Sequence, residues 1–496
     1  MKPRQIFTRS QNVAARRGGQ RTAHLPRARS KVALAALGAA ITLFAGCAVG
    51  PNYSRPDAPS QTGWKEPTVA TNAAVLPAEW WHIFGDADLD SLETQAVAAN
   101  QDLKGAVARV TQARALARVS KSEFFPAVSG DAAYSRNRLS ANRANVPQQN
   151  LDWDDYSASF DFSYELDVWG RIRRNVEAAR ADAAVVASDL EVVLLTLTAD
   201  VARNHYLLRS LDNEKRVIEA TIALRRAAVQ LQETRNRAGL INEVDVTRAR
   251  TELANVEADL HSVLRSRAEA EHALAVLCGQ PPANFSVAAR ASDFLPPQIP
   301  AGLPSSLLER RPDILEAEHG LEAASARIGV AKAAFFPTIK LTSTAGIASA
   351  DLGSVIDWPS RFFALGPSVH VPIFEGGRNV ANLQAAKARY EQSVAGYRGA
   401  VLNAFREVED SLSDLGTLAS QGDAVNRALT SARDTAALAG ERYQQGLSSY
   451  LDVVDAERLA LQAERQRTQL RGQQAISTVL LAKALGGGWK SGEAAP

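Results

Sequence analysis

The first 46 residues contain no acidic side chain and no apolar run long enough to cross a bilayer. Residues 1–31 carry nine lysines and arginines, and the apolar run at 32–45 falls well short of the roughly 20 residues that a spanning helix needs. This arrangement is typical of a cleaved export signal, which we assign to residues 1–46. Its removal takes nine positive charges from a formal net charge of +2, leaving −7. A nucleic-acid role therefore loses its electrostatic basis.

Cysteine is also scarce, with two in 496 residues. The signal ends in Leu43-Phe44-Ala45-Gly46-Cys47, which resembles a lipobox, the motif whose cysteine receives a diacylglycerol; an ordinary cleavage site before an incidental cysteine is the alternative. Ala48 follows where an aspartate would signal retention at the inner membrane, so we expect the outer membrane as the destination. Cys278 ends an expected helix and is interpreted as a small core residue. With Cys47 lipidated, no disulfide can form within the chain, and stability must come from packing.

Signatures of catalysis are missing from the sequence. We find no phosphate-binding loop, nucleophile elbow or zinc motif, and the seven histidines are scattered. His319, near Glu316 and Glu322, is interpreted as part of a solvated helix face. We therefore expect no enzyme, with no catalytic residue, no metal, and no cofactor apart from the lipid on Cys47.

The sequence repeats itself once, with an offset of 207 residues through its helical segments. The matched landmarks are Trp169-Gly170-Arg171 with Gly376-Gly377-Arg378, Gly239 with Gly446, Asp245 with Asp452, and Gly279 with Gly486. The Phe-Phe-Pro motif at 124–126 recurs at 335–337 with an offset of 211. Because this period is far longer than a solenoid repeat, each half must be a large unit. The duplication therefore favours one elongated body built from two pseudo-equivalent halves.

Proline and glycine are absent from residues 171–237, which predicts one helix of 67 residues, roughly 100 Å long at 1.5 Å per residue. From Ile172 to Val201 its apolar residues recur in alternating steps of four and three, a heptad pattern that predicts helix-on-helix packing. Further apolar side chains such as Val185 lie off this seam. They indicate contacts with more than one neighbouring helix.

The other helical segments complete two hairpins. Gly239 ends the long helix, and Asn242 looks like the cap of a second one that runs to about Leu277. Further helices are expected at 88–122, 312–334, 378–445 and 449–485. Each half should therefore fold back as a very long helical hairpin.

Strand patterns separate the Phe-Phe-Pro motif from the long helix in each half. Residues 156–165 alternate between a face of aromatic and alanine side chains and a face of serine and acidic side chains, and residues 365–373 alternate similarly. A ten-residue strand with one apolar and one polar face has the dimensions of a transmembrane β-strand. Either stretch alone fits a half-buried strand of a soluble sheet about as well.

Two strands in each half would give four in the chain. An open four-stranded sheet cannot stand alone in hydrocarbon, because the amides of its edges would be unsatisfied. Transmembrane barrels of this kind have at least eight strands. A membrane role therefore requires an oligomer, and composition does not choose between two copies and three.

Several motifs, in order along the chain, carry a family resemblance. They are Cys47 to Tyr53, Trp80-Trp81, Glu309 to Ile314, Gly366 to Arg378, and Tyr443 to Ala456. Together they resemble the TolC-like outer-membrane efflux factor family, in particular its lipoprotein branch of NodT/OprM type. The resemblance implies a mainly α fold with β: a trimeric 12-stranded β-barrel that continues into a 12-helix periplasmic α-barrel, with two tandem structural repeats per chain.

The same resemblance implies a function. The chain would be the outer-membrane channel of a tripartite efflux pump, passively conducting drugs and toxic compounds. Its partners would be two further copies in a homotrimer, a periplasmic adaptor (membrane fusion) protein and an inner-membrane pump of the RND type. It would be lipid-anchored in the outer membrane of a Gram-negative bacterium. The alternative is a periplasmic adaptor-like or structural coiled-coil lipoprotein, with long hairpins but no barrel. An adaptor would have soluble sandwich domains and one hairpin, not two hairpins each preceded by a pair of strands.

The expected organisation divides the chain into six parts. They are a signal peptide at 1–46, an extended proline-rich leader at 47–87, a first efflux repeat at 88–285, a linker at 286–307, a second repeat at 308–488 and a flexible tail at 489–496.

The candidate functional residues lie at the break between the long helices of the second half. Asp452 and Asp455 are three residues apart, so they lie on nearly one face of the helix that begins near Ser449. The resemblance implies that this end is the periplasmic gate, with both aspartates in acidic rings, Leu451 at an apolar constriction and Tyr443 in the bonds that hold the tip shut.

Two points remain open at this end of the helices. Asp245 and Arg248 in the first half are possible latch partners, and Ser448 stands where some relatives carry an arginine. The simpler alternative is that Ser449 and Asp452 form an ordinary helix cap.

Overall fold

The computed structural model describes residues 48–66, 76–142, 151–292, 294–302, 304 and 307–488. These residues belong to one compact unit, Ala48–Pro496. The expected signal peptide, the lipidation site Cys47 and the C-terminal tail lie outside the described residues.

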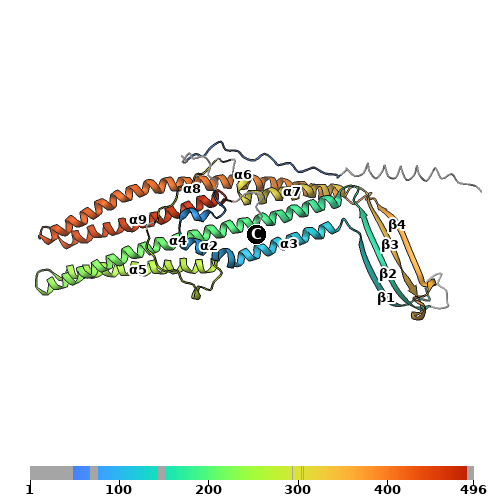
Figure 1. The fold of residues 1–496 in the computed structure, drawn as a ribbon, viewed down its shortest axis with the longest axis horizontal. Helices are drawn as coiled ribbons and strands as arrows, with labels where there is room; N and C mark the ends of the chain where they lie inside the picture. Colours follow the sequence, from blue (N-terminus) through green and yellow to red (C-terminus); the bar gives the residue numbers. More distant parts are fainter. Residues whose placement is uncertain are drawn as a thin grey trace, which may run out of the picture. The chain divides into compact units, whose positions relative to one another are not determined.

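Four long helices form two hairpins (Figure 1). They are α4 (Arg171–Arg237), α5 (Glu243–Leu277), α8 (Arg378–Gln444) and α9 (Tyr450–Ala484). Helices α4 and α8 each have 67 residues, and α5 and α9 each have 35. The expected tandem repeat is therefore confirmed at the level of whole helices.

Each hairpin turns through the same local chemistry. A left-handed glycine follows the first helix, Gly239 in one hairpin and Gly446 in the other, both with φ of 74°. A polar side chain then caps the second helix: Asn242 accepts from the Asp245 amide at 3.2 Å, and Ser449 caps α9. These signals are local in the sequence, which is why the helix limits could be predicted closely.

The first helical segment differs from the expectation. Residues 88–122 form two helices, α2 (Ala87–Ala99) and α3 (Gln101–Ser122), instead of one. Asn100 breaks them apart, because its side chain accepts from the Leu103 amide at 2.9 Å and donates to the Leu277 carbonyl at 2.9 Å. A short polar side chain that bonds to the backbone competes with helix continuation in this way.

The remaining helices are short, except for α7. They are α6 (Leu307–Arg310), α7 (Pro312–Ala333) and the 3₁₀ turns η1 (Trp80–Phe84), η2 (Pro282–Asn284), η4 (Leu352–Ser354) and η5 (Trp358–Ser360). No helix in the described part of the chain is long and apolar enough to cross a membrane.

Four strands form one antiparallel sheet. They are β1 (Ala127–Arg138), β2 (Asp152–Leu166), β3 (Thr338–Ser349) and β4 (Arg361–His370), in the order β1-β2-β3-β4. The central pair β2 and β3 joins the two halves of the chain. The expected strand at 365–373 ends at His370 instead, because Pro372 has no amide to donate to a neighbouring strand.

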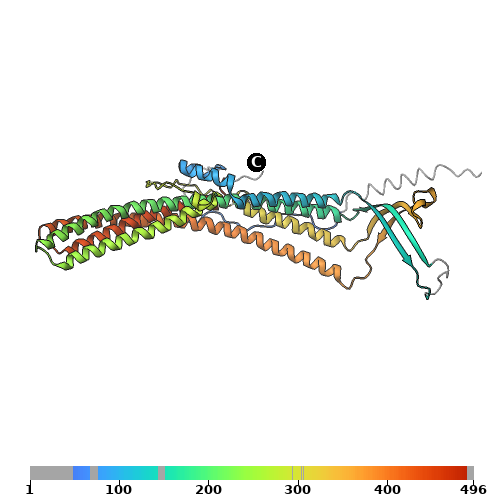
Figure 2. The ribbon, with the colours of Figure 1, turned by 90° about the horizontal axis from the view of Figure 1, so that it is seen from below.

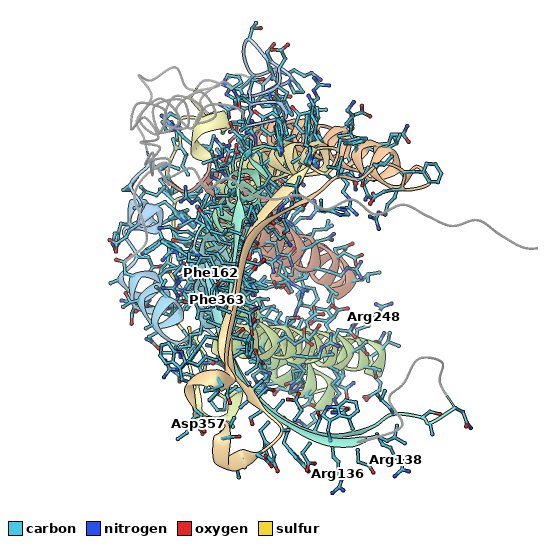
Figure 3. All side chains as sticks on the ribbon, turned by 90° about the vertical axis from the view of Figure 1, so that its right-hand side faces the viewer. Arg136, Arg138, Phe162, Arg248, Asp357 and Phe363 are labelled. Atoms are coloured by element: carbon cyan, nitrogen blue, oxygen red, sulfur yellow. The ribbon has the colours of Figure 1, made fainter. Side chains whose placement is uncertain are left out.

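The register gives the sheet one apolar and one polar face. Val128 lies opposite Phe162, and Leu365 lies opposite Ser343 in the same row. Phe162 and Phe363 both project from this face (Figure 3). The other face carries, among others, Ser129, Asp131, Ser159, Asp161, Thr342, Thr344 and Ser368. The alternation predicted for residues 156–165 therefore extends across the sheet, with Ser343 on the apolar face and Phe362 on the polar face among the exceptions.

The main core is built by both halves around the middle of the helices. Its fully buried side chains include Trp80, Leu208, Leu274, Tyr397 and Leu481. The Trp80 indole donates to the Thr198 hydroxyl at 3.3 Å, so even the large aromatic has its polar atom satisfied.

Residues 48–66 form a strap along the helices. The Val49 amide donates to the Trp169 carbonyl at 3.0 Å, and Trp64 donates to the Gly302 carbonyl at 2.9 Å. Gly50, with φ of 113°, crosses Gly329 of α7 so closely that a Cβ on Gly50 would lie 2.5 Å from the Gly329 Cα. This close approach requires a glycine at both positions.

Candidate functional site at the hairpin tip

The turns of both hairpins lie side by side, at the end of the helices away from the sheet (Figures 1 and 2). All four long helices meet there in a small apolar cluster. Its members are Val229 of α4, Ala249 of α5, Ala439 and Tyr443 of α8, and Tyr450, Val453 and Val454 of α9. At the tip, the two hairpins therefore touch through an apolar contact much smaller than the main core.

Tyr443 connects the end of α8 to α4. Its hydroxyl donates to Oε1 of Gln232 at 3.1 Å, and the guanidinium of Arg235 lies 5.2 Å from its ring centroid. Its ring also lies 5.6 Å from that of Tyr450. The structure thus places Tyr443 in contacts between the hairpins, at the position where tip-closing bonds were expected.

Asp452 closes a capping box with Ser449. Oδ2 of Asp452 accepts from both the backbone amide and the hydroxyl of Ser449, each at 2.9 Å. The bond from the backbone amide, together with that from the hydroxyl, lowers the pKa of the Asp452 carboxyl. Asp452 is therefore the cap that the simpler alternative anticipated, and any gate role would come in addition.

Asp455 points away from this cap. It forms an ion pair of 2.9 Å with Arg458, one turn further along α9. Leu451 is 40% exposed. The two aspartates are not bonded to each other.

Of the two first-half candidates, Arg248 faces this site across a groove. Asp245 lies 3.8 Å from Arg248 of its own helix. The groove, of about 390 Å³ between α5 and α9, is lined by Arg248 together with Leu451, Asp455 and Arg458. The structure thus brings Arg248 near the gate candidates, whereas Asp245 and Tyr443 do not line this groove.

Two residues at the tip were missed from the sequence. Arg458 pairs with Asp455 and lines the groove, and its spacing of three residues on the same helix could have signalled this. Gln232, the partner of Tyr443, is 211 residues away in the chain and gave no local signal.

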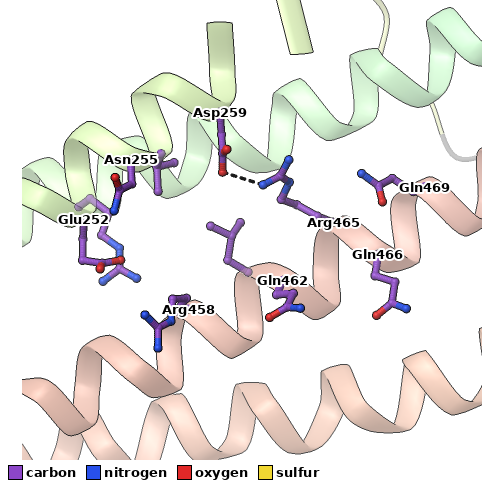
Figure 4. Close-up of a pocket in the computed structure, with 11 residues that line it drawn as sticks. Glu252, Asn255, Asp259, Arg458, Gln462, Arg465, Gln466 and Gln469 are labelled. Atoms are coloured by element: carbon purple, nitrogen blue, oxygen red, sulfur yellow. Dashed lines mark hydrogen bonds and ion pairs between the residues drawn. The ribbon is translucent and has the colours of Figure 1, made fainter. Parts of the chain in front are cut away.

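A second groove, of about 550 Å³, lies between α5 and α9 nearer the middle of the helices (Figure 4). Glu252, Asn255 and Asp259 line it from α5, and Arg458, Gln462, Arg465, Gln466 and Gln469 line it from α9. The Arg465 guanidinium bonds to Asp259 across it at 2.6 Å. Within the residues described, no group of histidine, cysteine and acidic side chains is arranged to hold a metal ion.

A sheet with one apolar and one polar face, attached to very long helical hairpins, is the architecture expected of an outer-membrane channel. The family described as outer membrane efflux protein matches the chain twice, at residues 92–280 and 303–487. The solvent efflux pump outer membrane protein SrpC of Pseudomonas putida is 35% identical over 462 residues, which cover 91% of this chain and 97% of SrpC.

Solved structures agree with this match. The outer-membrane channel OprN has a TM-score of 0.82 at 30% identity, covering 89% of this chain and 100% of that chain. The open state of the Neisseria gonorrhoeae MtrE outer membrane channel has a TM-score of 0.79 at 30% identity, covering 90% and 99%.

The chain belongs to the outer membrane efflux protein family. It has the fold of that family and is the outer-membrane channel component of an efflux pump in a Gram-negative bacterium. These matches favour the channel over the adaptor-like or structural coiled-coil alternative.

Proposed function

We propose that three copies of this chain form a passive efflux channel that is closed at the hairpin tip. The observation that carries the proposal is that, within the described residues, the sheet and the long helices each form a row with two open edges. In the sheet the edges are β1 and β4. In the adjoining helices the row is α3, α4, α7 and α8, and near the tip it is α5, α4, α9 and α8.

Such edges fit each other head to tail, and a repeated head-to-tail contact closes into a ring. The α3 edge carries exposed apolar side chains, Val107, Leu116 and Val119, which a neighbouring α8 would cover. Three copies would give the twelve strands expected from the family resemblance, with the apolar face of the sheet toward lipid and the polar face toward water.

The gate would consist of the contacts at the tip. Leu451 would narrow the passage, and three copies of Asp452 and Asp455 would place six carboxylates around it, which favours cations. The hydrogen bond between Tyr443 and Gln232 would hold the closed state, with Arg248 and Asp245 as further latch partners. An adaptor that binds this end would shift the balance between closed and open states.

The anchor and the pump complete the proposal. A lipid on Cys47, predicted from the lipobox-like motif, would anchor the chain in the outer membrane. An inner-membrane pump of the RND type would supply the energy, and the cargo would be small molecules of the kind that the name of SrpC mentions, solvents.

The test is conductance of the purified full-length protein in planar bilayers, with its mass in detergent. Wild type should be a trimer with small, cation-favouring conductance. The double variant Tyr443→Ala with Asp455→Ala should conduct more, while the control Asp423→Ala, an exposed carboxylate of α8 away from the tip, should not. A trimer whose double variant conducts like wild type would overturn the gate, and a monomer without conductance would overturn the channel.

A further inference from the structure

Helix α9 is attached to the rest of the chain unevenly along its length. Its buried residues fall into two groups, Tyr450 to Ala456 at the tip and Leu470 to Ala484 beside the main core. None of the thirteen residues from 457 to 469 is buried, and this stretch borders the polar groove of Figure 4. Apart from Leu461, which packs against Val256 and its apolar neighbours, the middle of α9 is held mainly by polar contacts.

The strongest of these contacts lies at the end of that stretch nearer the main core. Nε and Nη2 of Arg465 both reach Oε1 of Glu214 at 2.9 Å, and the Gln469 amide donates to the same carboxylate at 3.2 Å. Glu214 belongs to α4 and its side chain is 5% exposed. A buried carboxylate with several charge-assisted bonds is costly to separate from its partners. Arg465 also bonds to Asp259, so it ties α9 to both helices of the other hairpin.

Contacts closer to the tip involve fewer bonds. Arg225 of α4, whose side chain is 3% exposed, pairs with Glu457, whose side chain is about half exposed. Among the described residues, Asp455 and Arg458 pair with each other on α9 itself. Glu214 therefore receives more bonds across the hairpins than Glu457 does.

On the other side of Arg465, α9 lies so close to Ser210 of α4 that Gly472 has no room for a side chain. A Cβ on Gly472 would lie 2.3 Å from Oγ and 2.5 Å from Cβ of Ser210. From this crossing onward α9 is part of the main core, with Ala475, Val479 and Leu481 fully or almost fully buried.

We infer that the bonds of Arg465 and Gln469 to Glu214 are the fulcrum of the gate. When the tip opens, α9 swings away from α4 and α5 on the tip side of this clamp, and the part from Leu470 onward keeps its place. The inference rests on the proposed gate. It names the residues that set how far along α9 the opening movement extends from the tip. Glu214 and Arg465 are thus positioning residues for opening.

The test uses spin-label distances in the full-length protein, with two pairs of introduced cysteines. Asn255 and Gln462 are exposed on opposite sides of the groove and report the tip side of the clamp. Leu207 of α4 and Leu480 of α9, 38% and 40% exposed, report the core side. The native Cys278 is buried and burial raises the pKa of its thiol to about 11, so it should not react with the label.

The decisive variant is Glu214→Gln, which keeps the side-chain size and removes the charge that Arg465 needs. It should lengthen and broaden the distance between Asn255 and Gln462, leave that between Leu207 and Leu480 unchanged, and raise the open fraction in bilayers several-fold. The matched control is Glu464→Gln, because Glu464 pairs with Arg433 of the same hairpin at 2.8 Å and does not hold α9 to α4. It should leave both distances as in wild type.

The inference is overturned if Glu214→Gln leaves the groove distance unchanged, or if both distances change together. A second pair of variants checks that the core-side labels respond at all. Gly472→Ala should displace α9 from Ser210 and lengthen the core-side distance, and adding Ser210→Gly should restore it, because the atoms that the new Cβ meets are then gone.

Failure of the gate itself can be told apart. In the Tyr443→Ala, Asp455→Ala background the groove distance should increase and the core-side distance should not. If that variant changes neither conductance nor the groove distance, the gate at the tip is wrong, whereas the response to Glu214→Gln still decides whether the clamp holds α9.

Discussion

The hydroxyl of Tyr443 donates a 3.1 Å hydrogen bond to Oε1 of Gln232, and this bond joins the last turns of α8 and α4. Gln232 is 1% exposed, so its amide oxygen has no access to water if the bond is lost. Helix ends that would otherwise touch only through a small apolar cluster gain a specific partner in this way.

Tyr443→Phe should therefore open the channel partly. The change removes the hydroxyl and keeps the ring beside Tyr450, so each of the three copies loses one hydrogen bond of about 1 kcal/mol, or about fivefold in the ratio of open to closed for that copy. Single-channel recording measures that ratio. The double variant Gln232→Leu, Tyr443→Phe should open no further than Tyr443→Phe alone, because both changes remove the same hydrogen bond. If Tyr443→Phe behaves like wild type while Tyr443→Ala opens, the ring and not the hydroxyl holds the tip.

Asp455 and Asp452 should differ in their effect on ion selectivity. Asp455→Asn removes a carboxylate that faces the groove between the hairpins, so the preference for cations should fall. Asp452→Asn should change it less, because that carboxylate is bonded to Ser449 as a cap. Reversal potentials in a salt gradient measure both. Equal losses would show that the capping carboxylate also faces the passage.

The cap itself should depend on pH. Because hydrogen bonds from Ser449 lower the pKa of Asp452, the contribution of this cap is present above the ordinary pKa of an aspartate. It should be lost as the pH falls through the lowered value.

Glu93 should make the stability of the protein fall as the pH rises. Its side chain is completely buried in α2 and neither carboxylate oxygen has a hydrogen-bond partner. Burial, and next the charge of Asp90, raise its pKa from 4.5 to about 9. Between these values the folded protein keeps a proton that the unfolded chain releases, so each rise in pH favours unfolding.

Glu93→Gln should remove this dependence, because an amide does not titrate. The measurement is the unfolding temperature of the detergent-solubilised protein between pH 5 and 9. The control Glu391→Gln alters an exposed glutamate of α8 and should keep the slope of wild type. A slope that persists in Glu93→Gln would assign the pH dependence to other groups.

The strap of residues 48–66 should detach in Gly329→Ala. A Cβ at this position would lie 2.8 Å from Cγ of Arg174 and 3.0 Å from the Val49 carbonyl oxygen, so the strap or the arginine must move. Trypsin should then cleave after Lys65 several-fold faster than in wild type. Gly396→Ala is the matched control: nothing lies within 4 Å of its new Cβ, and replacing a helical glycine should stabilise by up to about 1 kcal/mol. Equal cleavage of the two variants would contradict the role of the glycine crossing.

Local signals in the sequence determined where the helices begin and end. Helix α4 has the predicted limits, because no proline or glycine interrupts it and Gly239 follows it. Asn242 caps α5 as expected. The break at Asn100 was missed, since an asparagine inside a helical pattern becomes a cap only when a partner such as the Leu277 carbonyl lies beside it.

The sequence also determined the faces of the strands and the repeat of the two halves, because both are periodic along the chain. Only the tertiary structure decided which elements meet. The pairing of β2 with β3 joins residues almost 200 positions apart, as in Tyr156 opposite Ser349. The bond of Arg465 to Glu214 spans 251 positions, and that of Tyr443 to Gln232 spans 211. Short-range propensity specifies the elements, whereas contacts between the hairpins depend on packing over distances that no local pattern records.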